Sequence, residues 1–569
     1  MEAEREPLLP GAQPTVPANN AWRKLSPRRI AIGLTLALAI SPSSSSRPFG
    51  AAPRPGSRNV FAPSRPRLRR YGANGACGAT KVRQGWRVAG RGKRRMDFIE
   101  DIAGPLASDR CTSDSPPFLQ AFTSLLVGQL VEQGKLSWTT PVTSLHPVSF
   151  EDPIASSQPN LIDILSHQTG LPRHDLLFLL WNTTEDYLAR VRYLEPTDPF
   201  RSKWQYNNWM FELAGAIVRN VTGQATWAAA LRDGILDPLN MTNTIASIFD
   251  LAYTRDHARA FDDEGNIMPY EAEGLLSAVT AAGAISTSAN EGSQWLRALL
   301  GRGTLSGTTL VEDATFEQLT KPHKTTDKPH ALGWFIADYR GHHSVTHGGT
   351  TLGFNSQVRF FPDDDLAYIV MTNTNSPGPS LVLNEVISER LLFPEIPGNS
   401  KWSVERKEQF RAAEEMARHL LDERKASRLN GTSPSHPLDD YPGLRRKWAA
   451  PPLVQSFWTF PCLLRLGTYT HPAYGRVKIT RPTPTSPTLH ARCINPGATF
   501  DFDLDHWHLD EFAISSDFEF ATEIGNIVFE TEAATGAVQS LVIPLESALV
   551  AGERGGVVMY QRHPPRRQL

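Results

Sequence analysis

The stretch "NSQVRFFPDDDLAYIVMTN", Asn355 to Asn373, decides the fold class of this chain. It contains two runs rich in β-branched and aromatic residues, separated by the turn signal Pro362–Asp365. Two similar runs come just before it, "LGWFIADY" (332–339) and "HSVTHGG" (343–349). Such runs, joined by short turns, predict consecutive strands of an antiparallel sheet.

Four segments upstream of these strands have apolar residues at helical spacing: 121–136, 160–172, 208–223 and 286–300. Gly134 is suited to end the first helix, and Asn208 is a suitable N-cap for the third. The fourth opens with a Ser288-x-x-Glu291 capping box. Helices followed by antiparallel strands predict an α+β domain.

The C-terminal part of the chain has a different pattern. Lys401–Arg428 is a charged amphipathic helix that would act as a connector. From about Tyr469, short runs alternate apolar and polar residues between turn signals, as in "GRVKITRP", "TLHARCI" and "VQSLVIPL". This alternation predicts a small antiparallel barrel or sandwich.

These patterns divide the chain into six segments. The predicted boundaries are a polar tail at 1–29, an apolar segment at 30–40, a basic segment at 41–120, the α+β domain with an incomplete N-terminal part at 121–400, a helical linker at 401–431, and the β domain at 432–569 with an insertion at 444–467.

The apolar segment "IAIGLTLALAI", residues 30–40, follows a tail with basic residues. Its length suits the core of a signal peptide or a signal anchor cut short. Either interpretation predicts the secretory pathway, with the body of the protein secreted or anchored to a membrane. Four N-x-S/T triplets fit this compartment and are predicted glycosylation sites: Asn182, Asn220, Asn240 and Asn430.

The net charge of -1 opposes nucleic-acid binding by the chain as a whole. Between Ser41 and Met96, however, there are basic residues and no acidic ones. This run is a basic arm for nucleic acid or anionic lipid, a disordered linker, or translated noncoding sequence. Because it lacks a folded partner surface, we expect no nucleic-acid partner.

Three local features follow one another along the predicted α+β domain. The helix that begins at Ala121 offers an N-terminus where a nucleophile can sit. "QYNNW" supplies Tyr206-x-Asn208 just before a helix, and "THGGTTLGF" supplies His347-Gly348-Gly349 at the end of a strand. Each feature alone is more often a surface turn, but their order and spacing indicate a catalytic site.

With these residues the chain resembles the serine β-lactamase and penicillin-binding-protein superfamily, especially the branch of class C β-lactamases, D-amino-acid peptidases and serine esterases. The resemblance covers about 121–392, through "LVEQGKLSWTTPV", "LIDILSHQTGLP", "YNNWMFELAGAIV", "AAGAISTSANEGSQWL" and "HGGTTLGFNSQVRFFPDDD". It implies an antiparallel sheet flanked by helices, with a helical subdomain. The tail containing "GTYTHPAYGRVKI" resembles the lipocalin-like domain that follows some of these hydrolases.

The resemblance also implies a chemistry. A serine at a helix N-terminus attacks a carbonyl, and a lysine one turn later assists its deprotonation. Matched motif to motif, Tyr206 and His347 take catalytic roles, with Tyr206 as the base or its relay. The second N–H of the oxyanion hole falls to Thr350. The substrate-binding residues implied are Asn208, Gly348, Gly349 and Thr350. Histidine rather than lysine at 347 favours an ester, lactone or amide over a carboxylate-bearing β-lactam.

The expected nucleophile is missing. Register with "AFTSLLVG" puts the serine at Pro117 and the lysine at Gln120, and no Ser-x-x-Lys occurs in the 569 residues. As written, the chain should not form an acyl-enzyme. Two alternatives stay open: a serine hydrolase whose native message contains the motif, or a pseudoenzyme that acts as a binding or scaffolding module.

Translated noncoding sequence accounts for the missing motif. "CTSDSPPFLQ" (111–120) consists largely of residues whose codons can be pyrimidine-rich, as a polypyrimidine tract and 3′ splice site would be. The resemblance begins at the next residue, Ala121. Similarly, "DDYPG", which ends at Gly443, and "TYTHPAYG", which begins at Thr468, would join directly without 444–467. We therefore interpret both places as noncoding sequence that was read through.

No metal or cofactor is expected. His342 and His343 adjoin His347, but no carboxylate or cysteine joins them at ligand spacing. The sequence has no G-x-G-x-x-G motif and no P-loop. Four scattered cysteines are too few for a disulfide scaffold or a zinc site.

Overall fold

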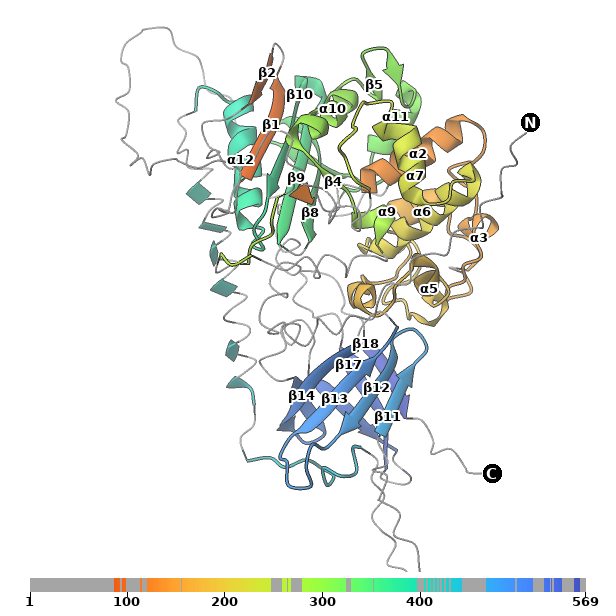
Figure 1. Ribbon diagram of the computed structural model, residues 1–569, viewed down its shortest axis with the longest axis vertical. Coiled ribbons are helices and arrows are strands. Elements are labelled where there is room, and N and C mark those ends of the chain that lie inside the picture. Colours follow the sequence, from red (N-terminus) through yellow and green to blue (C-terminus); the bar gives the residue numbers. More distant parts are fainter. Residues whose placement is uncertain are drawn as a thin grey trace, which may run out of the picture.

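The computed structural model describes two connected parts, an α+β domain and a β-barrel (Figure 1). The described residues are 86–92, 95–98, 113–114, 120–442 and 467–562, the last two ranges with gaps, of which the longest are 247–257, 268–278, 515–525 and 545–556. The predicted tail at 1–29 and the apolar segment at 30–40 lie outside these residues.

The sheet of the α+β domain has six antiparallel strands in the order β2-β1-β10-β9-β8-β7. Their bounds are β1 Trp86–Gly92, β2 Arg95–Phe98, β7 Phe335–Tyr339, β8 His342–Thr351, β9 Phe354–Phe361 and β10 Leu366–Thr372. The turn Pro362–Asp364 between β9 and β10 is a single turn of 3-10 helix, η9. The four strands predicted around the opening stretch are confirmed, and so is the α+β class.

Successive residues of β10 contact helices on the two faces of this sheet. Ile369 packs on one face against α10 (Ala289–Leu300), beside Gly292. The next residue back, Tyr368, points to the other face, and its hydroxyl donates to the carbonyl of Asn384 in α12 (Gly378–Leu392) at 2.6 Å. Because successive side chains of a strand point to opposite faces, one strand anchors both helical layers.

The remaining helices form a subdomain beside the sheet (Figure 1). They are α2 Gln120–Glu132, α3 Val142–Leu145, α4 Leu161–Leu165, η5 Asp175–Leu179, α5 Thr184–Leu188, η6 Val191–Tyr193, α6 Asn208–Thr222, α7 Trp227–Leu231, the π-helical turn η7 Arg232–Leu236, α9 Thr280–Gly283 and α11 Asp313–Thr320. Two small strand pairs complete the domain: β3 Ser113–Asp114 with β4 Ser286–Thr287, and β5 Thr304–Leu305 with β6 Thr308–Thr309.

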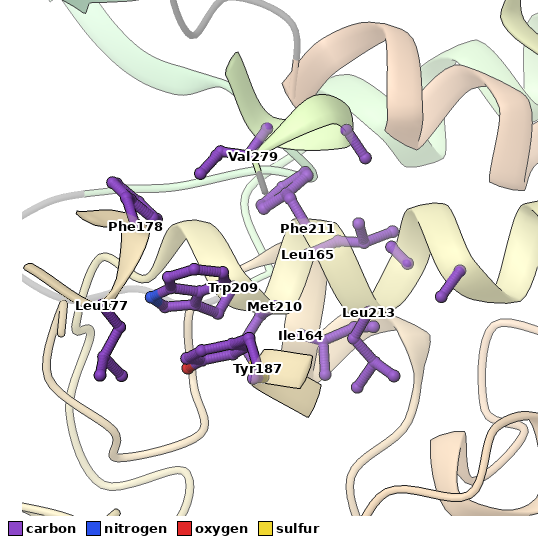
Figure 2. Close-up of a cluster of buried hydrophobic side chains, with 14 of the residues drawn as sticks. Ile164, Leu165, Leu177, Phe178, Tyr187, Trp209, Met210, Phe211, Leu213 and Val279 are labelled. Carbon is purple, nitrogen blue, oxygen red and sulfur yellow. The ribbon is translucent and has the colours of Figure 1, made fainter. Parts of the chain in front are cut away.

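The core of the subdomain gathers around α6. Trp209 stacks on Tyr187 with ring centroids 3.4 Å apart, and Phe178 lies against its other side at 4.5 Å. Figure 2 shows this aromatic group beside Met210 and Phe211 of the same helix. Rings held on both sides leave the first turn of α6 little freedom, which matters for the site described below.

Helix ends follow the predicted signals with two differences. Gly134 and Gly223 adopt left-handed φ values of 68° and 72° just beyond α2 and α6, as C-cap glycines do. The N-cap of α6 is Asn207 rather than Asn208, because the Asn207 side chain accepts the N–H of Met210. Ser288 caps α10 as predicted, but no capping box forms.

The expected partner in that capping box, Glu291, has another use. Its carboxylate accepts the backbone N–H of Asn243 at 2.8 Å and the hydroxyl of Thr244 at 2.5 Å. It therefore ties α10 to a distant loop instead of to its own N-terminus.

The expectation of no regular structure across 41–120 is wrong for three short stretches, β1, β2 and β3. Residues of β1 pair antiparallel with β10, from Trp86 opposite Thr372 to Arg91 opposite Ala367, and β2 pairs with β1. The sequence of β1, "WRVAGRG", lacks a clean alternation, so pairing with a distant strand outweighs its weak local preference. β1 and β2 limit the proposed noncoding stretch to residues between Phe98 and Gln120, and β3, which pairs with β4, lies inside it.

The C-terminal strands close into a barrel in sequence order, from β11 to β18. They are β11 Gly467–His471, β12 Gly475–Thr480, β13 Leu489–Ile494, β14 Thr499–His508, β15 Glu511–Ile514, β16 Ile527–Thr531, β17 Val538–Pro544 and β18 Val557–Arg562. The predicted barrel is confirmed. The run "DFDLDHWHLDEF" forms most of the hairpin of β14 and β15.

Tyr441 from the preceding linker fills the barrel. It is fully buried, its ring packs against Phe512 and Phe529, and its carbonyl accepts the hydroxyl of Tyr469 at 2.8 Å. The described residues of the predicted linker between Val404 and Ala426 are helical. Among the helices that the structure describes, none is both long and apolar enough to pass through a bilayer.

The two ends of the predicted insertion lie side by side. A Cβ added to Gly467 would stand 2.6 Å from the carbonyl oxygen of Pro442 and 2.9 Å from that of Tyr441. The chain thus leaves the barrel at 442 and resumes it at 467 in nearly the same place. A chain that joined Gly443 directly to Thr468 would put Gly443 where Gly467 now lies.

Deleting residues 444–467 is therefore expected to leave the barrel folded. The midpoint of thermal unfolding should change by no more than about 4 °C, since a shorter loop costs less closure entropy and Gly443 would replace Gly467, the one described residue removed, opposite Ile479. Differential scanning calorimetry checks this, with Tyr441→Ala as a destabilised control. A deletion variant that unfolds without a cooperative transition would show that the segment is part of the fold.

Candidate active site

Gln120, the first residue of α2, lies between the two residues of the Tyr-x-Asn motif. Its amide Nε2 donates to the hydroxyl of Tyr206 at 2.7 Å and to Oδ1 of Asn208 at 3.0 Å. Gln120 is fully buried, and Gly333 makes room for the start of the helix because a Cβ there would stand 2.9 Å from the Gln120 carbonyl carbon. The residue expected at the lysine position thus contacts both partners that the motif match assigned.

His167 holds the other end of the Gln120 side chain. Its Nδ1 accepts the backbone N–H of Asn207 at 3.1 Å, so the proton of the neutral ring is on Nε2. Nε2 then donates to Oε1 of Gln120 at 3.2 Å. This bond orients the Gln120 amide with its nitrogen toward Tyr206 and Asn208, so the three hydrogen bonds of the amide are mutually consistent.

Arg173 and Asp175, just before and at the start of η5, also contact the motif. Nδ2 of Asn208 donates to Oδ1 of Asp175 at 3.1 Å, and the other Asp175 oxygen pairs with Arg173 at 2.6 Å. The Arg173 guanidinium lies over the Tyr206 ring, 4.7 Å from its centroid. Asp175 and Arg173 therefore link the two motif residues to each other by contacts that do not involve Gln120.

The third motif brings β8 to the same place. The rings of Tyr206 and His347 have centroids 6.3 Å apart. Nδ1 of His347 donates to the carbonyl of Gly348 at 2.7 Å, which leaves Nε2 as an acceptor with no partner in the described part of the chain.

Among the described residues, no strand pairs with one side of β8 beyond His347. Pairing with β7 ends at Thr346, while Gly348, Gly349 and Thr350 continue to pair with β9. An edge of this kind offers backbone groups to a ligand. The Thr350 hydroxyl donates to Oδ1 of Asn355 at 2.7 Å, which fixes the strand there.

Burial keeps the histidines of the site uncharged. It holds the pKa of His347 at about 4 and that of His330 at about 3, and it lowers the pKa of His167 well below 6.5. His330 lies 4.9 Å from His167 and 4.8 Å from Phe335, centroid to centroid. At neutral pH the site therefore presents neutral imidazoles, and the nearby cation Arg173 is paired to Asp175.

The buried histidines predict acid sensitivity. Between pH 6.5 and 3 the unfolded chain binds a proton at His330 that the folded chain refuses, so stability falls as the pH falls. Replacing His330 by phenylalanine removes this pH-dependent loss of stability. Compared with wild type, the variant should gain about 2 kcal/mol at pH 5 relative to pH 7.5. Urea unfolding at both pH values checks this. The same difference in free energy of unfolding between variant and wild type at pH 5 and at pH 7.5 would contradict it.

The structure thus brings Tyr206, Asn208, His347 and Gln120 together, while Pro117 lies outside the described residues. The sequence analysis did not single out His167, Arg173, Asp175 or His330, although His167 lies within the quoted run "LIDILSHQTGLP". No group of metal-ligating side chains occurs among the residues that the structure describes.

Comparison with known proteins gives consistent matches. Residues 120–391 match the family described as Beta-lactamase. The chain is 27% identical to Unguisins hydrolase ungD' of Aspergillus campestris over 384 residues, 63% of this chain and 67% of that protein. It is also 27% identical to Unguisins hydrolase ungD of Aspergillus violaceofuscus over 316 residues, 48% of this chain and 55% of that protein.

More distant matches are similar in kind. Protein flp of Staphylococcus aureus is 23% identical over 272 residues, 45% of this chain and 52% of that protein. Among solved structures, the octameric penicillin-binding protein homologue from Pyrococcus abyssi has a TM-score of 0.47 at 14% identity, covering 84% of this chain and 96% of that one. A class C β-lactamase from Rhodobacter sphaeroides has a TM-score of 0.40 at 21% identity, covering 52% and 91%.

Proposed function

Because residues 120–391 belong to the β-lactamase family, we propose that this chain derives from a serine hydrolase that cleaves an ester, lactone or neutral amide through an acyl-enzyme. The observation that carries the proposal is the contact of Gln120 with both Tyr206 and Asn208. A lysine amine at that position would reach the same two oxygens. The site is therefore arranged for a Ser-x-x-Lys motif, although the motif itself is missing.

In the proposed reaction a serine one turn before residue 120 attacks the substrate carbonyl carbon. Its proton passes toward the Tyr206 oxygen, and the same proton goes to the leaving group when the tetrahedral intermediate collapses. Asn208 binds the substrate amide, and the Thr350 N–H shares the oxyanion with the N–H of the serine. Water then hydrolyses the acyl-serine by the reverse proton path.

The neutral site supports an uncharged substrate. The pKa of His347 is lowered to about 4 by burial, so this residue offers no positive charge to a carboxylate at pH 7. We therefore propose that a free carboxylate beside the scissile bond weakens binding.

The alternative is a pseudoenzyme, which one observation favours. The Gln120 amide satisfies Tyr206, Asn208 and His167 together, as a substitution adapted to a site without chemistry would do. In that case the fold serves as a binding or scaffolding module.

Restoring the missing serine and lysine distinguishes the hydrolase from the pseudoenzyme. Pro117→Ser with Gln120→Lys should make the protein react with a fluorophosphonate probe, whereas Pro117→Ala with Gln120→Lys should not. Adding Tyr206→Phe to the first variant should slow labelling by roughly 100-fold, the usual contribution of a general base. A folded double variant that the probe leaves unlabelled would favour the pseudoenzyme.

We further propose that the protein enters the secretory pathway. Three of the predicted acceptor residues, Asn182, Asn220 and Asn240, are exposed, and Asn430 lies outside the described residues. Treatment of the secreted or membrane fraction with an amidase that removes N-glycans tests this, since a glycosylated chain would shift on a gel.

A further inference from the structure

The turn between β11 and β12, His471–Gly475, reaches from the barrel into the α+β domain. The Tyr474 hydroxyl and Nδ1 of His174 share a hydrogen bond of 2.6 Å, and the indole N–H of Trp181 donates to the carbonyl of Ala473 at 2.9 Å. Tyr474 is 1% exposed and His174 4% exposed, so water does not compete for this bond. The contact is a buried joint between the two parts of the protein.

The turn is built to hold one shape. Nδ1 of His471 accepts the backbone N–H groups of Ala473 and Tyr474, at 3.1 and 3.2 Å. Gly475 has a φ of 76°, and a Cβ there would stand 1.5 Å from the Asn495 side chain. Only glycine fits at that position, so the Tyr474 ring is presented in a fixed direction.

His174 lies between Arg173 and Asp175 in the chain. It has a left-handed φ of 52°, and its carbonyl accepts the indole N–H of Trp209 at 3.1 Å. Its neighbours are Arg173, over the Tyr206 ring, and Asp175, bonded to Asn208. Trp209 itself is held between Tyr187 and Phe178, as Figure 2 shows.

We propose that Tyr474 is a positioning residue: the barrel turn fixes His174, and through it Arg173 and Asp175 keep Tyr206 and Asn208 in their working geometry. The barrel is then part of the site's machinery rather than an appended domain. The positioning itself follows from the contacts above, and only its catalytic consequence rests on the proposed function.

The first test uses the chain as it stands. In protein labelled with ¹⁵N at the tryptophan indoles, the Trp209 signal reports its bond to His174. Tyr474→Phe should shift this signal and raise the exchange rate of its proton roughly fivefold, the loss expected for one weakened neutral hydrogen bond. The matched control is Tyr469→Phe, which removes an equally buried hydroxyl bond inside the barrel, to the Tyr441 carbonyl, and should leave Trp209 unchanged.

The proposal would be overturned if the Trp209 signal and its exchange rate changed equally in Tyr474→Phe and Tyr469→Phe, or changed in neither. If Tyr474→Phe fails to fold, His174→Asn breaks the same bond from the other side, because asparagine tolerates the left-handed backbone. It should move the Trp209 signal in the same way, and an unmoved signal would again overturn the proposal.

The second test measures the consequence for the site. In the Pro117→Ser, Gln120→Lys background, Tyr474→Phe should slow fluorophosphonate labelling roughly tenfold, while Tyr469→Phe should not. Absence of labelling in every variant would count against the proposed function alone, because the Trp209 result does not depend on chemistry. Equal labelling rates in the two tyrosine variants would overturn the positioning role.

Discussion

Replacing Gln120 by leucine is expected to lower the free energy of unfolding by about 3 kcal/mol. The substitution removes three buried hydrogen bonds, to Tyr206, Asn208 and His167, and leaves their polar atoms facing an apolar side chain. Each buried polar group left unsatisfied costs about 1–3 kcal/mol, which the added apolar burial offsets only in part. Urea unfolding at pH 7.5 measures the loss.

Gln129 in the same helix provides the matched control. Its amide donates to the carbonyls of Gly234 and Leu310, but it is only partly buried, so water can replace it. Gln129→Leu should cost about 1 kcal/mol. The free energy of unfolding of Gln120→Lys should lie between those of wild type and Gln120→Leu, because an amine can still donate to Tyr206 and Asn208. Equal losses for Gln120→Leu and Gln129→Leu would show that Gln120 does not organise the site.

Replacing Arg359 by methionine is expected to destabilise the protein by about 3–5 kcal/mol, because it leaves Glu385 as a buried charge without its partner. Arg359 in β9 pairs with Glu385 of α12 at 3.1 Å and donates to the Ser388 hydroxyl at 2.9 Å. Both charged residues are 8% exposed. The pair joins the outer helix to the centre of the sheet.

A double-mutant cycle separates the pair from its surroundings. Arg359→Met with Glu385→Leu should recover most of the loss, since neither charge is then buried alone. Thermal unfolding of the four proteins gives the coupling. Additive losses in the double variant would mean that the two residues act independently.

The strands and helices of the α+β domain were predictable where local pattern and tertiary structure agree. The run from Asn355 to Asn373 carries its own turn, and α2 and α6 carry their own caps. The error at α6 is instructive: Asn207 and Asn208 are adjacent and either can cap a helix, so only the direction of the backbone decides. Residue type alone does not contain that information.

Features that depend on distant partners could not be predicted. β1 has a weak strand pattern of its own and gains its pairing from β10, far along the chain. His167 lies in a quoted motif and Arg173 and Asp175 do not, but the role of all three comes from where the chain before α6 is placed, which no local pattern shows. The contact of Tyr474 with His174 joins residues 300 positions apart, which no local pattern encodes.

We propose that a serine hydrolase site has lost its nucleophile to translated noncoding sequence. Sequencing the reverse-transcribed message across residues 90–130 and 440–470 tests this most directly. We expect a spliced message that encodes Ser-x-x-Lys just before "AFTSLL" and joins "DDYPG" to "TYTHPAYG". A mature message that encodes both segments as they stand would contradict the claim and would identify the chain as a pseudoenzyme.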